Sequence, residues 1–383
     1  MYKQPCYSKD PEIVRNRKDK SLLVVHTLQP GRLLDPSVSF PDEVKHLDLD
    51  GDRNSSRVEN RELYCVDEEF YSKTLFKDLA LFHNLETFTA CGIRLDMNLW
   101  KEWARGCTQL REINLSNIYT ETDYFAFDKQ TLETIFKIPT LRKVKIESLE
   151  LPFFPPGPSN IEELTITARA YEHYFEKDDD GKDEFDIDEM VESYSKNLCT
   201  HTNLKKLRIE HFVKFFMSPE PLLNMAKYCV KLEELYLEFI EITTKEDNED
   251  VNAVRANVFE KIFQLPNLKK CTLVCSTTTS IDDKPIAIER LVNDTTLIFP
   301  SITQLRLLRQ GEFCAKNTGC DWILTDDEIK EVLKQFPNLQ SCWRDNVQLL
   351  DIFTVLISLL IYNYLKMWKK SPHFFNFLYI TTS

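Results

Sequence analysis

The chain has 383 residues, of which 43% are hydrophobic and 28% are charged, a balance typical of a folded, soluble protein. Its formal net charge of −13 at pH 7 opposes non-specific attraction to nucleic acid or to an anionic membrane surface. Length and composition therefore predict two ordinary domains or one extended array, with no nucleic-acid partner.

Residues 1–39 form a polar N-terminal segment that lacks the apolar core of a secretory signal. The chain contains 11 cysteines, an odd number, and several of them lie inside apolar strand-like runs, as Cys91 and Cys271 do. No Cys-x-x-Cys pair occurs, so the sequence gives no support for a structural zinc site. This usage favours reduced thiols in a cytoplasmic or nuclear protein over a disulfide framework.

From residue 40 to residue 345, one short apolar pattern recurs about ten times. An apolar residue is followed by others three and five positions later, and the final spacing of two is typical of a β-strand, where alternate side chains share a face. Successive units begin 20 to 43 residues apart, so the array is irregular. The predicted strand cores are residues 44–49, 85–90, 110–115, 141–146, 161–166, 204–209, 232–237, 268–273, 302–307 and, more weakly, 339–344.

The segments between these cores carry the period of amphipathic helices. Helices are predicted at residues 128–138, 219–229, 252–265 and 325–336. Prolines follow them at the points where a helix must end. No glycine-rich phosphate turn follows any strand, which argues against a doubly wound α/β domain. The alternation of strand and helix therefore predicts an α/β solenoid.

Two units also carry a cysteine three residues before the first apolar position. Residues 107–115 (Cys-x-x-Leu-x-x-Ile-x-Leu) and 229–237 (Cys-x-x-Leu-x-x-Leu-x-Leu) resemble the cysteine-containing repeats of F-box and leucine-rich-repeat proteins. The resemblance implies an irregular leucine-rich-repeat solenoid, with parallel strands on the concave face and helices on the convex face. Extracellular repeats place an asparagine three residues after the last leucine, and this position holds Ile93, Ile118, Leu149, Phe212 and Ile240. The missing asparagines favour an intracellular array.

An F-box is a helical segment that normally precedes such repeats and holds the adaptor subunit of a cullin ligase. Residues 40–44 resemble its opening, but they lead directly into the first repeat strand. The preceding segment contains a single apolar cluster, at residues 22–25, and two prolines. We therefore expect no F-box within this chain: it was lost, lies outside the chain or was never present.

In a solenoid of this type, the side chains that alternate with the core leucines point into the concave face. The candidate partner-binding residues share that position, and they are Asn114, Ser116, Lys145, Arg208, Glu210, Tyr236, Glu238 and Arg306. Tyr236 and Arg208 are the preferred candidates, because Tyr and Arg are enriched among interface hot spots. A protein partner suits such a polar surface better than a small molecule, which needs an apolar pocket.

No motif for catalysis, metal binding or cofactor binding interrupts the repeats. The sequence has no nucleophile elbow, no His-Glu-x-x-His motif and no P-loop, so we expect no enzyme activity and no cofactor. The acidic run at residues 176–189 places Gly181 as a calcium loop does, but Ile187 stands where the bidentate Glu is required. We interpret the run as a solvated insertion.

Residues 152–158, with the sequence PFFPPGP, separate two strand cores by an unusually short step. Four prolines in seven residues are incompatible with a helix. We interpret this segment as an extended structural connector in preference to a docking motif.

Residues 346–383 form an apolar C-terminal tail, which contains an almost uninterrupted apolar run at residues 349–365 that admits Asp351 and Asn363. That run is shorter than the ~20 apolar residues that a spanning helix needs. Three interpretations remain open for the tail: a membrane anchor, a helix that caps the end of the array, and an aberrant C-terminus.

Together these patterns predict a non-enzymatic protein–protein interaction module. The F-box resemblance implies a substrate-recognition array in ubiquitin ligation, with a cullin-ligase adaptor as a further partner if an F-box exists outside this chain. The alternative is a membrane-tethered leucine-rich-repeat scaffold, held on the cytosolic face of a membrane by residues 349–365 and unrelated to ubiquitin.

Overall fold

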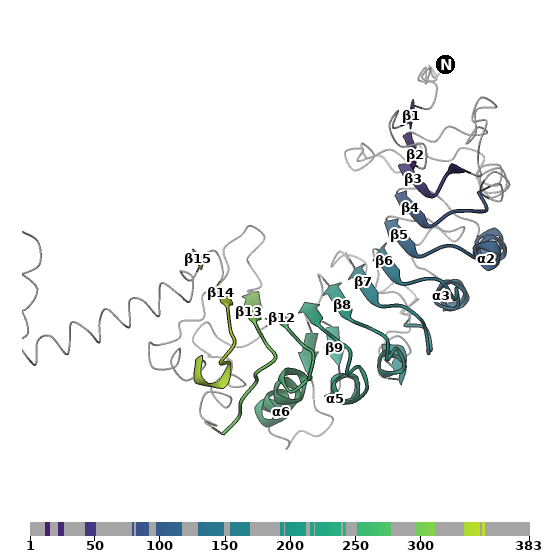
Figure 1. The fold of residues 1–383 in the computed structure, drawn as a ribbon. Helices are drawn as coiled ribbons and strands as arrows, with labels where there is room; N and C mark the ends of the chain where they lie inside the picture. The colour runs from purple at the N-terminus through teal and green to yellow at the C-terminus, as the bar shows by residue number, and fades with distance from the viewer. Residues whose placement is uncertain are drawn as a thin grey trace, which may run out of the picture.

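The computed structural model shows a curved array built on one long β-sheet (Figure 1). It describes residues 12–15, 22–26, 43–50, 79, 82–91, 97–116, 129–148, 154–168, 192–194, 196–211, 215–217, 219–238, 240–242, 251–276, 296–310, 333–344 and 347–348. One strand–turn–helix unit follows another along the curve, and each unit contacts its neighbours in chain order (Figure 1). The predicted α/β solenoid is confirmed.

The main sheet has 13 strands within the described ranges. They are β1 (Glu12–Arg15), β2 (Leu22–His26), β3 (His46–Asp50), β4 (Thr87–Cys91), β5 (Glu112–Ser116), β6 (Lys143–Ser148), β7 (Glu163–Ala168), β8 (Lys206–His211), β10 (Glu234–Glu238), β12 (Lys270–Ser276), β13 (Gln304–Gln310), β14 (Ser341–Arg344) and β15 (Val347–Gln348). All neighbours from β2 to β14 pair in parallel, whereas β1 and β15 close the two ends as antiparallel partners. A smaller parallel sheet joins β9 (Phe215–Met217) to β11 (Ile240–Ile242).

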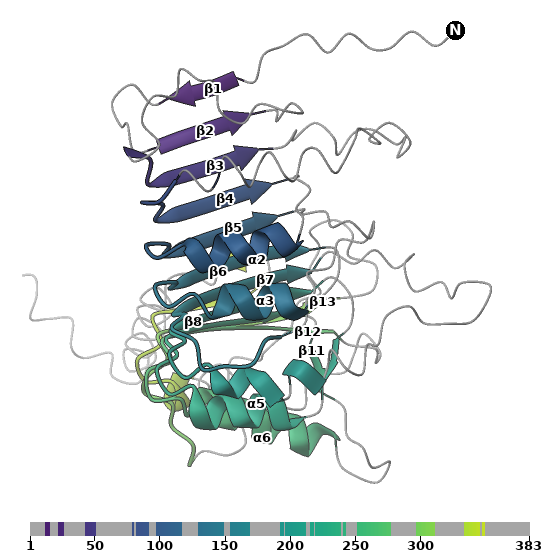
Figure 2. The same cartoon turned by 90° about the vertical axis from the view of Figure 1, so that its right-hand side faces the viewer.

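Helices cover one face of the main sheet and leave the other face open (Figures 1 and 2). They are α2 (Met97–Gly106), α3 (Lys129–Phe136), α5 (Pro219–Tyr228) and α6 (Val251–Phe263), with the 3-10 turn η5 (Leu198–Thr200) between α3 and α5. Parallel strands require such crossover segments, because a tight hairpin can join only antiparallel neighbours. Each strand core predicted from the sequence overlaps a strand of the main sheet between β3 and β14, and the strand begins two residues after the predicted core does.

Three of the four predicted helices correspond to α3, α5 and α6. The fourth, at residues 325–336, is described only at 333–336, of which 333–335 are helical; residues 325–332 lie outside the described residues. Helix α2 was not predicted. Its signal is the three-residue spacing of Trp100 and Trp103, which are both buried and pack on each other with ring centroids 4.8 Å apart.

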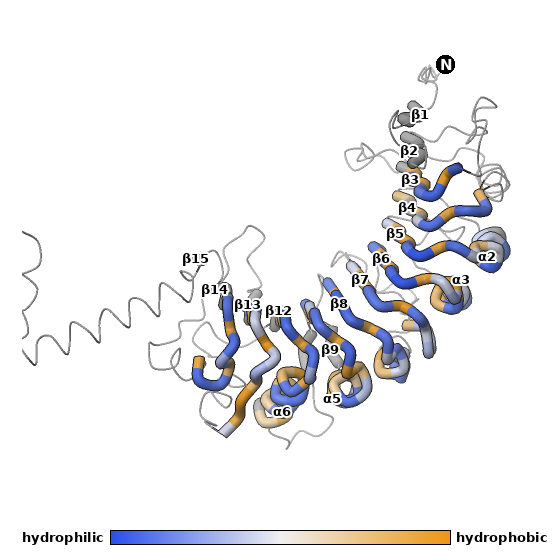
Figure 3. The backbone as a smooth tube through the Cα atoms, viewed as in Figure 1, coloured by the Kyte–Doolittle hydropathy of each residue, from blue (hydrophilic) through white to orange (hydrophobic). Residues whose placement is uncertain are grey.

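The core lies between the sheet and the helices, and it follows directly from the repeat pattern. In β5, Ile113 and Leu115 are fully buried while their neighbours in the strand are partly exposed. The same alternation recurs in β4 and β10. Figure 3 shows the result as apolar and polar positions alternating along successive strands. Each unit therefore buries its leucines against the next one, as a solenoid requires.

Residues 154 and 155 of the proline-rich connector pack into the core between β6 and β7, whereas residues 152 and 153 lie outside the described residues. Residues 154–159 have no regular secondary structure, as the prolines predicted, and Phe154 is fully buried. The Phe154 amide donates to Ser193 Oγ (3.0 Å), and its carbonyl accepts from Asn197 Nδ2 (2.8 Å). Its ring packs on Tyr194 with a centroid distance of 4.8 Å. This segment therefore has a structural role.

A histidine takes a core position in the same unit. His201 is 1% exposed, and its Nε2 donates to the Pro155 carbonyl at 2.9 Å. Its Nδ1 then accepts from Ser159 Oγ at 2.7 Å, an arrangement that suits the neutral ring. Burial lowers the pKa of His201 below its ordinary value, which keeps the ring uncharged.

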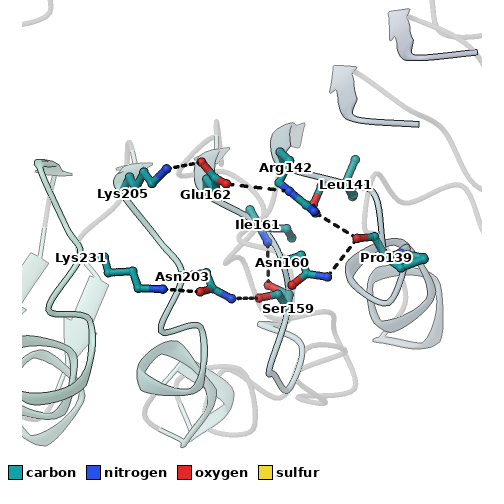
Figure 4. A network of polar contacts seen from close by, with 10 residues as sticks. All are labelled: Pro139, Leu141, Arg142, Ser159, Asn160, Ile161, Glu162, Asn203, Lys205 and Lys231. Atoms are coloured by element: carbon teal, nitrogen blue, oxygen red, sulfur yellow. Dashed lines mark hydrogen bonds and ion pairs between the residues drawn. The ribbon is translucent and has the colours of Figure 1, made fainter. Parts of the chain in front are cut away.

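Asparagines join neighbouring repeats from the position just before the first core leucine. Four of them donate a side-chain N–H to a carbonyl of the preceding repeat, with N···O distances of 2.8 to 3.0 Å. The donor–acceptor pairs are Asn160–Pro139, Asn203–Ser159, Asn267–Val230 and Asn338–Pro300. Each of these bonds satisfies a carbonyl that lies outside the hydrogen bonds between the strands. The position three residues after the last core leucine, where extracellular repeats carry an asparagine, holds apolar residues in this chain. Figure 4 shows Asn160 and Asn203 in place.

Strands β1 and β2 extend the main sheet into the segment before residue 40. Residues 349–365 lie outside the described residues, so the three interpretations of the tail stand as they were. Among the described residues, no helix has the length and apolar character needed to cross a membrane.

Candidate interaction surface

The predicted binding residues all lie on strands of the main sheet, at positions that alternate with buried core residues. Four of them come together on the neighbouring strands β8 and β10: Arg208, Glu210, Tyr236 and Glu238. The other four are more distant: Asn114 and Ser116 lie on β5, Lys145 lies on β6 and Arg306 lies on β13. Four of the eight predicted residues are therefore close together on the open, helix-free face of the sheet.

We call this group the concave patch and define it as Thr167, Arg208, Glu210, Tyr236 and Glu238. The Arg208 guanidinium lies over the Tyr236 ring, 4.0 Å from its centroid, and forms an ion pair with Glu210. The Tyr236 hydroxyl donates to Glu238 Oε2 at 2.9 Å. Thr167 on β7 was not among the predicted residues, and its hydroxyl donates to Glu210 Oε2 at 2.9 Å. Each side chain of the patch is thus held by another.

Partial burial controls the electrostatics of the patch. Burial raises the pKa of Glu238, and the neighbouring Glu210 carboxylate raises it further. The pKa of Tyr236 is raised by burial and by the negative charge of Glu238, so the phenol stays protonated and keeps donating its hydrogen bond. The Glu238 carboxylate is therefore a half-buried negative charge whose direct partner is a neutral hydroxyl.

Asn114 and Lys145 lie side by side in register on β5 and β6. Asn114 Oδ1 is buried and has no hydrogen-bond partner among the described residues. Lys145 is exposed, and no carboxylate of the described chain lies within ion-pair distance of its amine. Arg306 is likewise exposed, and it pairs in register with Thr272 of β12.

A second set of charges runs across the N-terminal edge of the strands, and these charges neutralise one another. We call it the charge ladder. Its outer row contains ion pairs between neighbouring repeats: Lys45–Glu86 (2.8 Å), Arg142–Glu162 (3.8 Å), Glu162–Lys205 (2.6 Å) and Glu233–Lys269 (2.7 Å). Figure 4 shows Glu162 between the cations of two adjacent repeats.

The inner row of the ladder repeats the arrangement one residue further along each strand. Its ion pairs are Lys143–Glu163 (3.6 Å), Glu163–Lys206 (3.5 Å) and Glu234–Lys270 (3.0 Å). The sequence contained the signal for both rows: the doublets at residues 142–143, 162–163, 205–206, 233–234 and 269–270 are alternately basic and acidic. Parallel register then sets each doublet beside one of opposite sign.

The pKa values of two ladder carboxylates are lowered, whereas the pKa of Glu238 is raised. Hydrogen bonds from Lys205 and Lys269 lower the pKa of Glu162 and of Glu233, respectively. Both carboxylates are partly exposed at the surface, so each pair contributes little individual stability. The ladder is a set of surface ion pairs that places opposite charges of neighbouring repeats side by side.

The cysteines that marked the repeat resemblance belong to the core. Cys107 and Cys229 are buried free thiols, and burial raises the pKa of each to about 12. A thiol with so high a pKa is a poor nucleophile and a poor metal ligand. Within the described ranges, no group of His, Cys, Asp and Glu side chains is arranged to hold a metal ion.

No protein-family model matches the sequence, and no curated protein matches it. Internalin C2 of Listeria monocytogenes aligns with 60% of this chain and 74% of its own, at 15% identity and a TM-score of 0.31. A chain of the yeast Rad7–Elc1 complex aligns over 79% of this chain and 69% of its own, at 14% identity and a TM-score of 0.35. A leucine-rich-repeat protein of Leptospira interrogans aligns over 82% and 76%, at 14% identity and a TM-score of 0.31. Such distant likenesses carry no conclusion about function.

Proposed function

We propose that this chain is a protein-binding module whose partner docks on the concave face of the sheet. The observation that carries the proposal is the Arg208 guanidinium stacked on the Tyr236 ring at the centre of the concave patch. Tyr and Arg supply much of the energy of protein interfaces. Glu210 and Glu238 already hold the two side chains, so a partner loses little of its binding energy to ordering them.

Site-directed cross-linking tests this proposal. A photoreactive amino acid replaces Thr272, which neighbours Tyr236 in register on β12, and a matched variant carries it at Glu102 on the convex helix α2. We expect a protein cross-linked from Thr272 that is absent from the Glu102 variant. The cross-link should disappear when Tyr236→Ala is added. Equal cross-linking from both positions contradicts a concave docking site.

We further propose that the bound protein is a substrate for ubiquitin ligation. The cysteine-containing repeats at residues 107–115 and 229–237 support this assignment through their resemblance to F-box repeat proteins. The mechanism is positioning alone, with the concave face presenting the target to a ligase. Reduced cysteines suit work in the cytoplasm or nucleus.

Co-purification of the full chain with a cullin-ligase adaptor tests the ubiquitin assignment. We expect the adaptor to be recovered with a chain whose native N-terminus has been established by transcript sequencing. If the adaptor is not recovered with that chain, the ubiquitin assignment is wrong, although the protein-binding proposal is untouched.

The apolar run at residues 349–365 favours one alternative, a membrane-tethered scaffold. Fractionation of cell extracts distinguishes the two by comparing the full chain with a chain that ends at Asn346. The scaffold predicts that only the full chain sediments with membranes, and equal solubility of both chains contradicts it.

A further inference from the structure

Lys145 and Glu238 are charged side chains of the concave face that form no ion pair with another described residue. Lys145 on β6 is exposed, and no described carboxylate is within ion-pair distance of its amine. Glu238 on β10 is half-buried and accepts a hydrogen bond from the Tyr236 hydroxyl, and no described Lys or Arg nitrogen is within ion-pair distance of its carboxylate. The nearest cation, Arg208, is committed to Glu210 and to the Tyr236 ring.

The surface between these two charges is electrically balanced. Thr165 on β7 lies next to Lys145 in register, and Arg208 on β8 follows next to Thr165. The charge of Arg208 is neutralised by Glu210 through their ion pair. Lys145 and Glu238 therefore remain as opposite charges on β6 and β10, while Glu147 lies two residues beyond Lys145 on β6 and Arg306 lies on β13.

The sheet sets the distance between Lys145 and Glu238. Neighbouring strands are about 4.8 Å apart, and Glu238 lies one two-residue step further along its strand than the row that contains Lys145. Together these steps place the two Cα atoms about 16 Å apart. On an α-helix, roughly eleven residues, or three turns, span that distance and return to the same helix face.

We propose that the concave face binds a protein segment with one acidic side chain that pairs with Lys145 and one basic side chain, about 16 Å away, that pairs with Glu238. This inference rests on the proposed protein-binding function and specifies the chemistry of the partner. Charge complementarity carries it: a partly desolvated carboxylate without a cation gains more from a partner's charge than an exposed one does.

Selection from a library of random displayed peptides tests the inference on the full chain. Peptides selected on the native protein should be enriched in pairs of one acidic and one basic residue. Selection on Glu238→Lys should replace the basic member by an acidic one, and selection on Lys145→Glu should replace the acidic member by a basic one. The matched controls, Glu102→Lys on α2 and Lys137→Glu beyond α3, make the same charge changes on the convex side and should leave the selection unchanged.

Affinities of the selected peptides provide the second measurement. Glu238→Gln removes the charge and keeps the shape, so it should weaken binding of native-selected peptides about tenfold even if Glu238→Lys fails to fold. Peptides that lose affinity for Tyr236→Ala but ignore the charge at 145 and 238 overturn this inference and leave the proposed function standing. Peptides that bind Tyr236→Ala as tightly as the native protein overturn both.

Discussion

Strand β10 carries two glutamates on the same face of the sheet, and their surroundings differ sharply. Glu234 forms an ion pair with Lys270 of the next repeat at 3.0 Å, whereas Glu238 accepts a hydrogen bond from the neutral hydroxyl of Tyr236. The first belongs to the charge ladder and the second to the concave patch. A charge that pairs with the next repeat contributes to the contact between repeats. A charge that pairs with no repeat is available for an ion pair with another molecule.

The largest effect that separates the two regions is on partner binding. Tyr236→Ala removes the ring that supports Arg208 and the donor that holds Glu238, so affinity for the partner cross-linked at Thr272 should fall by at least about 30-fold. The ladder variant Lys269→Ala should change that affinity by less than about twofold. Isothermal titration calorimetry measures both. A similar loss in the two variants would erase the distinction between the regions.

The next effect is on thermal stability, and here the ladder should respond more strongly than the patch. Changing Lys269 and Lys270 together to Glu replaces two ion pairs by four neighbouring carboxylates, which should lower the midpoint of thermal unfolding by roughly 2–5 °C. At about 1 M salt the loss should largely vanish, because the screening length shrinks to about 3 Å. Lys145→Glu, which breaks no ion pair, is the control. A loss that persists in high salt contradicts an electrostatic ladder.

A smaller effect concerns Glu238 itself. Its raised pKa means that the folded state disfavours the charged carboxylate, so Glu238→Gln should increase the free energy of unfolding at pH 7 by less than about 1 kcal/mol. Between the raised pKa and the ordinary value of 4.5, the folded state binds more protons than the unfolded state. The advantage should therefore shrink as the pH falls through this window and be absent below it.

Urea unfolding at several pH values measures the effect, and Glu234→Gln is the matched control on the same strand. Because Glu234 pairs with Lys270, its replacement should not stabilise the protein at any pH. Stabilisation by both substitutions would mean that the two glutamates have similar surroundings.

The smallest effect is a difference in titration midpoints. Carboxyl resonances followed by NMR should show Glu162 and Glu233 titrating below 4.5 and Glu238 titrating above it. The ladder carboxylates should thus add stability that is present above their unfolded pKa and is lost as the pH falls through the lowered folded values. A shared midpoint for all three would show that the ladder cations and the burial of Glu238 have no electrostatic effect.

Much of the fold could be predicted because its signals are local. The spacing of Leu110, Ile113 and Leu115 predicts a strand with one buried face, and the structure buries all three. Alternation along the same strands also identified four of the five residues of the concave patch. Helix α2 escaped prediction because its apolar positions are tryptophans in a largely polar segment. Thr167 occupies the same register position as Glu210, so the alternation that identified Glu210 could have identified Thr167 as well.

The inter-repeat contacts could be recognised only after folding. The doublets of the ladder and the asparagines before the core leucines are visible in the sequence, but they are separated by irregular steps of 20 to 43 residues. Such irregular spacing does not indicate which of these side chains come into contact. The parallel register does, because it places Glu163 beside both Lys143 and Lys206 whatever the length of the segments between them.

The sequence by itself determined the solenoid, its core and the side chains on its open face, because each depends on residues a few positions apart. Only the tertiary structure decided which charges are neutralised and which remain free, because pairing depends on distances of a few ångströms between repeats that are remote along the chain. The free charges at Lys145 and Glu238 therefore became visible only once the neighbouring charges had found their partners.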